Sequence, residues 1–363
     1  MSMTDMTPKQ RILNAMRGEE IDRAPWSPFL AYYWEHLTEE ERACGQTEYL
    51  KAMGADPLLR GFGAAYRVEQ KNCTITRGGD GRKGYTTFET KVGTLTEEHT
   101  YSPSGRTWFL TGHPVKTEED FRVLQYLMEN QIVVPSPDDV EALHRNLGED
   151  GLLVPILGVH CKTAFQSLVE RWCGTENLTY ALYDFPEVVQ ECLQVMWEKD
   201  LETVKASANT SAEAFIFWED SSTTNISPAM FEAYTAPELN QWSRVLHDNG
   251  KLLIHHACGH LRDIIPAMCR TGIDVIESIS PPPTGNIDIG EAAAMMPDHV
   301  GLIGGIEPTF FQDCTMDELE ARVHHLLDTM AGKRFVLANS DSCPPYVAYE
   351  KFKLVSEIVK GRG

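Results

Sequence analysis

The chain has 363 residues, of which 42% are hydrophobic, so it can bury the core of one large α/β barrel or of two medium domains. Its formal net charge of −21 makes nucleic acids and anionic membranes poor partners. It has no run of eighteen apolar residues and no apolar signal segment at its start, so we expect a cytoplasmic protein without a membrane span.

The first predicted element is a helix between Thr7 and Gly18. Thr7 is suited to be its N-cap, Pro8 to the first helical position, and Gln10 completes a capping box. Gly18 is expected to end the helix. Residues 1–23 are therefore expected to form a helical extension that precedes the main fold.

Eight short apolar runs follow, and helical patterns separate the later ones. The runs are Pro25–Leu30, Asp56–Phe62, Leu152–Gly158, Ala214–Glu219, Lys251–His256, Ile273–Glu277, Val300–Ile306 and Arg334–Asn339. The helical patterns are Phe165–Cys173, Val188–Ala206, Pro228–Asn249, Leu261–Arg270, Ile289–Met296 and Met316–Met330. This alternation predicts an α/β fold with a parallel sheet, and the strand number favours a (β/α)8 TIM barrel. An open, doubly wound sheet is the main alternative.

One stretch departs from the alternation. From Arg67 to Trp108 the apolar residues recur with period two, and turn residues separate the runs, as in Gly78-Gly79-Asp80-Gly81. We expect an antiparallel β insertion over about residues 65–110, after the second barrel strand. It could cover the active site or be a peripheral surface sheet.

The chain has nine scattered cysteines with no Cys-x-x-Cys pair, and two of them suggest a metal site. His256 and Cys258 follow an apolar run and share one face of the predicted strand, because side chains alternate along a strand. Cys343, just past the last run, could complete an open three-ligand zinc site, which is the arrangement used in Lewis-acid chemistry. The alternative is a buried histidine with two inert thiols.

Other polar and aromatic side chains lie near the ends of the predicted strands, where barrel enzymes carry their active sites. Glu219 could be a fourth metal ligand or a base, or it could cap the next helix. His160 could donate a hydrogen bond to a leaving oxygen. We expect five residues to contact the substrate, three of them aromatic and two acidic. The alternative for the aromatic residues is that they belong to the core, as such clusters often do. These five are Tyr32, Tyr33, Trp34, Glu277 and Asp341.

Several segments resemble the uroporphyrinogen decarboxylase superfamily. The resemblance runs from about Arg11 to the last helix and implies a barrel fold. It rests on Arg11-Ile12 through Gly18-Glu19, Asp22-Arg23-Ala24-Pro25, Val92-Gly93-Thr94-Leu95, Ser227-Pro228-Ala229-Met230-Phe231 and Gly272-Ile273-Asp274. The decarboxylases of the superfamily carry an arginine-rich segment near the N-terminus, but residues 27–34 here contain no arginine.

The other branch of that superfamily comprises the zinc-containing, cobalamin-dependent methyltransferases. Their His-x-Cys-Gly motif and late cysteine are matched here by His256, Cys258, Gly259 and Cys343. The resemblance implies Zn²⁺ as cofactor and cobalamin supplied by a separate corrinoid protein. The chain has no Asp-x-His-x-x-Gly segment of its own, so the corrinoid is expected on a partner.

We therefore expect a zinc-dependent methyltransferase. It is expected to form one domain over residues 1–363, either as a monomer or as a homodimer. The aromatic residues after the first run favour a methoxylated aromatic as methyl donor, with O-demethylation as the reaction. Methylation of a thiol is the first alternative, and a decarboxylase-like lyase is the second. A scaffold subunit with a structural zinc is a further alternative, but structural zinc usually has four protein ligands.

Overall fold

The computed structural model describes residues 5–103 and 107–363, and its contacts divide the chain into two compact units. Of the described residues, 5–64, 137–156 and 208–363 form the barrel unit, and 65–103, 107–136 and 157–207 form the insertion unit. The description of the chain as one domain stays a prediction.

The barrel unit is built on short parallel strands that are buried almost completely. These strands are β1 (Leu58–Arg60), β8 (Leu152–Val154), β9 (Ala214–Glu219), β10 (Leu252–Ala257), β11 (Val275–Ile279), β12 (Gly301–Ile306) and β13 (Phe335–Asn339). Every residue of β11, β12 and β13 is buried, as expected for strands covered on both faces.

Backbone hydrogen bonds join neighbouring strands around the barrel. Strands β9 to β13 form one parallel sheet in sequence order, and β1 pairs with β8. A bridge between Ile156 and Ile216 joins the β8 segment to β9, and a bridge between Trp26 and Leu337 adds a further segment beside β13. The N–H of Asp56 donates to the carbonyl of Trp26, at 2.7 Å, which links that segment to the chain before β1. The predicted eight-stranded TIM barrel is confirmed for the described residues.

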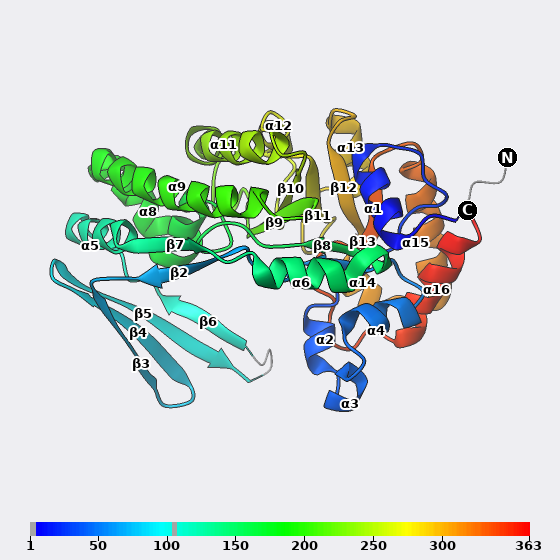
Figure 1. Cartoon of the computed structure of the whole chain (residues 1–363), viewed down its shortest axis with the longest axis horizontal. Coiled ribbons are helices and arrows are strands. Elements are labelled where there is room, and N and C mark those ends of the chain that lie inside the picture. Colours follow the sequence, from blue (N-terminus) through cyan, green and yellow to red (C-terminus); the bar gives the residue numbers. More distant parts are fainter. Residues whose placement is uncertain (1–4, 104–106) are drawn as a thin grey trace. The chain divides into compact units, whose positions relative to one another are not determined.

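Helices cover the outside of this barrel. In Figure 1, α11 packs on β10, α13 and α15 pack on β12, and α1 packs on β13. The helices of the unit are α1 (Pro8–Arg17), α2 (Tyr32–His36), α3 (Glu39–Arg42), α4 (Gln46–Ala52), α6 (Asp138–Leu147), the 3₁₀ turn η1 (Gly148–Asp150), α10 (Pro228–Met230), the π-helical turn η3 (Phe231–Thr235), α11 (Ala236–His247), α12 (Ile265–Met268), α13 (Ile289–Met295), α14 (Pro308–Asp313), α15 (Met316–Thr329) and α16 (Tyr349–Lys360).

A buried ionic network ties the N-terminal helix to the barrel. Arg11 of α1 donates to Asp22 from Nε at 2.6 Å and to Asp56 from a terminal nitrogen. Arg23 also donates to Asp56, which accepts in addition from the N–H of Trp26. Burial opposes ionisation of Asp22, but hydrogen bonds from Arg11 and the chain lower its pKa to about 2. The Asp-Arg-Ala-Pro segment of the sequence therefore has a structural role.

The insertion unit contains the expected antiparallel sheet. Strands β3 to β6 pair in sequence order, and β2 pairs with β7 (Figure 1). Its elements are β2 (Tyr66–Gln70), β3 (Cys73–Gly79), β4 (Lys83–Thr90), β5 (Gly93–Ser102), β6 (Thr107–Gly112), α5 (Glu118–Glu129), β7 (Gln131–Pro135), α7 (Ala164–Ser167), the π-helical turn η2 (Leu168–Trp172), α8 (Gly174–Asp184) and α9 (Pro186–Ala208). Whether this sheet covers the active site stays a prediction.

The capping box predicted at the start of α1 is present, and Gly18 ends the helix in a left-handed conformation. Several predicted elements were too long, among them the strands expected at Asp56–Phe62 and Leu152–Gly158, which are reduced to β1 and β8. The expected strand Pro25–Leu30 is reduced to the bridge at Trp26, and the expected helix Leu261–Arg270 is reduced to α12.

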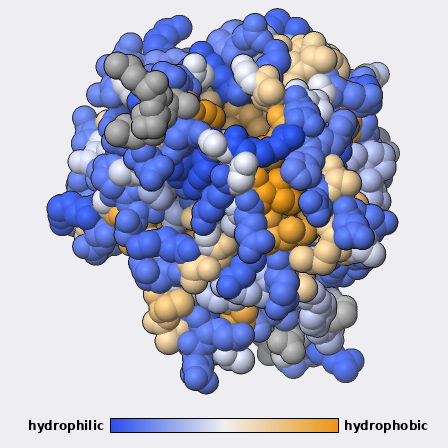
Figure 2. All heavy atoms as spheres, turned by 90° about the vertical axis from the view of Figure 1, so that its right-hand side faces the viewer, coloured by the Kyte–Doolittle hydropathy of each residue, from blue (hydrophilic) through white to orange (hydrophobic). Residues whose placement is uncertain are grey.

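Hydrophilic residues cover most of the face drawn in Figure 2, and hydrophobic ones show only in limited areas among them. Among the described residues, no helix has the length and apolar character needed to cross a membrane.

Candidate metal centre

The register of β9, β10 and β11 aligns three side chains inside the barrel. His256 of β10 lies opposite Trp218 of β9 and Glu277 of β11. The neighbouring His255 stacks on Phe217 at 4.4 Å, with Phe231 of the helical layer beyond. Because side chains alternate along a strand, the row that contains His256 faces the barrel interior.

Cys258 is held just beyond the end of β10 by the segment that follows β9. Its N–H donates to the carbonyl of Glu219 at 3.1 Å, and the N–H of His260 donates to Ser222 Oγ at 3.0 Å. Gly259 between them has φ +89°, and a Cβ there would lie 2.5 Å from the Ser222 Cβ. Only glycine fits this close turn without strain, so the His-x-Cys-Gly pattern has a local geometric cause.

Asp341 reaches the same region from the segment after β13. That segment is anchored by Asn339, whose side chain donates to the carbonyl of Phe29 at 2.9 Å and accepts from its N–H at 2.8 Å. The N–H of Ser342 donates to Asp341 Oδ1, which restrains the carboxylate.

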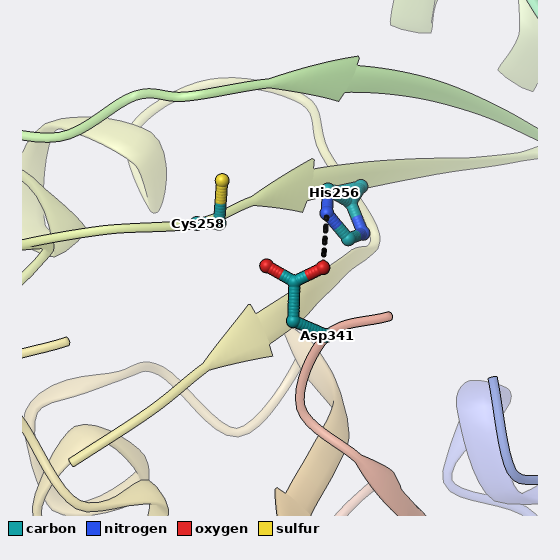
Figure 3. Close-up of side chains that lie close together, drawn as sticks. All are labelled: His256, Cys258 and Asp341. Carbon is teal, nitrogen blue, oxygen red and sulfur yellow. Dashed lines mark ion pairs between the residues drawn. The ribbon is translucent and has the colours of Figure 1, made fainter. Parts of the chain in front are cut away.

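His256, Cys258 and Asp341 form a compact group of potential metal ligands (Figure 3). One ligand atom of each lies within 4.8 Å of the others. The Asp341 carboxylate points toward the imidazole, with Oδ1 3.9 Å from Nε2. Burial lowers the pKa of His256, against the opposing effect of the nearby carboxylates, and this direction favours the neutral ring that binds metals.

The donor set of this group suits zinc. Nitrogen, sulfur and carboxylate oxygen are its usual protein ligands, and three of them leave one position for a substrate. His256 Nδ1 is buried and has no hydrogen-bond partner, so the ring is not committed to another structural contact through that atom. The residues present therefore fit a zinc ion.

A buried ion pair lies behind His256. Arg60 of β1 approaches Glu277 with Nε 2.6 Å from Oε1, and each side chain is only 1% exposed. The guanidinium also donates to the carbonyl of Ser27 at 2.9 Å. Burial lowers the pKa of Arg60, opposed by the charge of Glu277, and arginine stays protonated in proteins. Glu277, expected to contact substrate, is thus paired within the barrel.

Two aromatic side chains flank the group. Phe29 and Trp218 stack with 5.3 Å between ring centroids and 17° between planes. The Trp218 ring also lies 4.7 Å from that of His256, and the Arg60 guanidinium lies 5.5 Å from the centre of Phe29.

Cys343, expected as the third ligand, is buried beside these residues but lies outside the group. Its N–H donates to the carbonyl of Phe29 at 2.9 Å, and its Sγ lies 3.7 Å from the carbonyl of Pro344. Burial raises the pKa of the Cys343 thiol. Asp341, which we expected to contact substrate, lies in the group with His256 and Cys258 instead.

Glu219 also lies outside the group. Its Oε2 is 3.1 Å from Nε2 of His255 and accepts from Ser221 Oγ at 3.2 Å. These contacts are on the helix-facing side of the sheet, so its expected role as a fourth ligand finds no support in this geometry.

The remaining predicted site residues have other surroundings. Tyr33 packs on Phe352, with 5.0 Å between ring centroids, and Trp34 packs edge-on to Tyr49, while Tyr32 is 48% exposed. His160 belongs to the insertion unit, where its ring meets Trp172 edge-on at 5.5 Å. Burial lowers the pKa of His160.

Arg60 was missed by the sequence reasoning. Its signal was a cation inside the apolar run Leu58-Leu59-Arg60, where only a paired charge is stable. Trp218 and Phe29 fall within the predicted strands Ala214–Glu219 and Pro25–Leu30, but neither was expected at the site.

A family model and individual protein sequences that resemble this chain point to the same family. The family model described as uroporphyrinogen decarboxylase (URO-D) matches residues 112–362. Proteins named uroporphyrinogen decarboxylase from Parasynechococcus marenigrum (strain WH8102) and Synechococcus sp. (strain CC9902) are 20% and 21% identical over 234 residues. Those matches cover 62% of this chain, and the chain spans 63% of the length of these relatives.

A solved structure described as a methyltransferase from Methanosarcina mazei shares the fold. It matches with a TM-score of 0.63 and 14% identity, and the match covers 99% of both chains.

Proposed function

The chain belongs to the uroporphyrinogen decarboxylase family, and we propose that it is a zinc-dependent methyltransferase of that family. It would move a methyl group between a small substrate and the corrinoid of a separate protein. The observation that carries the proposal is the group of His256, Cys258 and Asp341 at the end of the barrel strands. Active sites of such barrels lie at this end.

His256 and Cys258 would bind the metal, and the segment 341–343 would supply the third ligand. Within this segment, the carboxylate of Asp341 lies in the group with His256 and Cys258. Zinc, when bound, would stabilise negative charge on the oxygen or sulfur atom that exchanges the methyl group. The fold shared with a protein described as a methyltransferase supports the proposal as an analogy only.

The ring pair of Phe29 and Trp218 supports a methoxylated aromatic as methyl donor. The two rings stack nearly parallel beside His256, so a planar substrate could pack against them near the metal ligands. In that reaction the methyl carbon would leave the oxygen, whose bonding electron pair remains on the phenolate. The methyl group would pass to the reduced corrinoid, which provides the electron pair for the new bond.

A decarboxylase with a substrate of many carboxylates fits the barrel interior less well. Such a substrate needs cationic side chains, but the buried cation Arg60 is already paired with Glu277. The neighbouring segment, residues 27–34, contains no arginine.

The test is single-turnover methyl transfer with zinc-loaded protein, a cob(I)alamin-carrying corrinoid protein and a panel of methoxylated aromatics. We expect the absorption of methylcobalamin to rise with wild type and to be abolished in Cys258→Ser. Cys269→Ser is the matched control, because Cys269 is a partly buried thiol of the same unit outside the group. Methylation of a thiol from methylcobalamin would instead support the first alternative. Loss of carboxylate from a uroporphyrinogen, without methyl transfer, would contradict the proposal.

A further inference from the structure

The two nitrogens of the His256 ring face two different carboxylates. Nε2 faces Asp341 at 3.9 Å, on the side of the ligand group. Nδ1 faces Glu277 at 4.0 Å, inside the barrel. Both distances are too long for hydrogen bonds, but small ring movements would close either of them.

The strand that carries Glu277 becomes irregular directly after this residue. The register between β11 and β12 shifts between Glu277 and Ile279, and Ser278 at the shift has φ +87°. A left-handed conformation is costly for a residue with a side chain and persists only where the surrounding structure imposes it. The constrained residue Ser278 therefore directly follows the glutamate whose Oε2 lies 4.0 Å from His256 Nδ1.

The Arg60 guanidinium contacts only one side of the buried Glu277 carboxylate. The ion pair between Arg60 Nε and Glu277 Oε1 uses one carboxylate oxygen. Oε2, the oxygen nearest to His256, has no hydrogen-bond partner. A carboxylate oxygen without a donor therefore faces the buried ring nitrogen that also lacks a partner.

We infer that Glu277, held by Arg60, is a positioning residue that fixes the His256 ring with Nδ1–H toward the barrel interior. That tautomer presents the lone pair of Nε2 to the metal and makes the ring a stronger ligand. Histidines that bind metals commonly donate their other N–H to a carboxylate in this way. The inference rests on the proposed metal site and assigns to it a pair of residues that bind neither metal nor substrate.

The adjacent strand position provides a matched control. His255 and Glu219 are also a buried histidine–carboxylate pair, with 3.1 Å between Nε2 and Oε2. They lie on the other side of the sheet and outside the ligand group. Glu219→Gln therefore makes the same chemical change as Glu277→Gln without touching the ring that would bind metal.

The experiment is a titration of metal-free full-length protein with Co²⁺, followed by the thiolate-to-cobalt absorption from Cys258. We expect Glu277→Gln to raise the dissociation constant about 10- to 100-fold, the usual effect of removing such a partner. Glu219→Gln should stay close to wild type. The absorption at saturation should be the same in all three proteins, because the thiolate ligand is unchanged.

Equal affinity in wild type and Glu277→Gln would overturn the inference while leaving the metal site intact. Equal losses in both variants would also overturn it, because a general effect of buried charge would then suffice. No Co²⁺ binding by folded wild type would refute the proposed metal site itself. If Glu277→Gln does not fold, the charge-free double variant Arg60→Met/Glu277→Gln replaces it, with the same loss expected.

Discussion

Removing Arg60 alone should destabilise the protein far more than removing both charges of its buried pair. The side chains of Arg60 and Glu277 are each 1% exposed and approach to 2.6 Å. Arg60→Met leaves the Glu277 carboxylate buried without a counter-charge and the carbonyl of Ser27 without its donor. Breaking a buried pair in this way costs about 3–5 kcal/mol.

The double variant Arg60→Met/Glu277→Gln removes the charge imbalance. Replacing both members of a buried pair is often nearly neutral, so we expect its unfolding free energy within about 2 kcal/mol of wild type. The four proteins form a double-mutant cycle, measured by urea unfolding. The coupling free energy should be at least about 2 kcal/mol.

Two results would refute this reasoning. The first is a loss of less than about 1 kcal/mol in Arg60→Met, which is the size of an exposed ion pair rather than a buried one. Alternatively, the double variant could lose the sum of the two single losses, which would show that the side chains do not interact.

Three further predictions concern separate parts of the chain. Asp22→Asn should lower the unfolding free energy by about 2 kcal/mol near neutral pH, because its pKa is lowered from 3.8 to about 2. That difference should shrink as the pH falls from about 4 to about 2, where the wild-type carboxylate is protonated; a pH-independent difference would contradict it. Trp218→Ala should weaken binding of a methoxylated aromatic by about tenfold, the value of a lost aromatic contact, with metal content retained; unchanged affinity in a binding titration would contradict the ring platform. Gly259→Ala should reduce metal affinity in a Co²⁺ titration, because the new Cβ meets Ser222 and displaces Cys258; full affinity would contradict the strained turn.

The barrel and the His-x-Cys segment could be predicted because their signals are local. Short apolar runs mark strands buried on both faces, and alternation along one strand fixes which side chains share a face. His256 and Cys258 are two residues apart, so their proximity follows from strand geometry alone.

The position of Asp341 beside His256 and Cys258 could not be predicted because it depends on contacts between distant segments. The hydrogen bonds between Asn339 and Phe29 anchor the start of the last loop, in which Asp341 rather than Cys343 lies in the group. The surroundings of Glu219 depend on the neighbouring strand. Its strand ends at the expected place, but the alternation directs its side chain toward His255.

The aromatic residues show the same limit. The cluster Tyr32, Tyr33 and Trp34 was expected at the substrate, but α2 turns Tyr33 and Trp34 toward α4 and α16. Phe29 and Trp218, which come from segments far apart in the chain, meet beside His256 instead.

The measurement that tests the central claim most directly is zinc content, by elemental analysis of wild type, Cys258→Ser, Asp341→Asn and Cys343→Ser. The account predicts about one zinc per chain in wild type and its loss in Cys258→Ser. Loss in Asp341→Asn or in Cys343→Ser identifies the third ligand. Folded wild type that holds no zinc, and takes up none when zinc is added, would contradict the account.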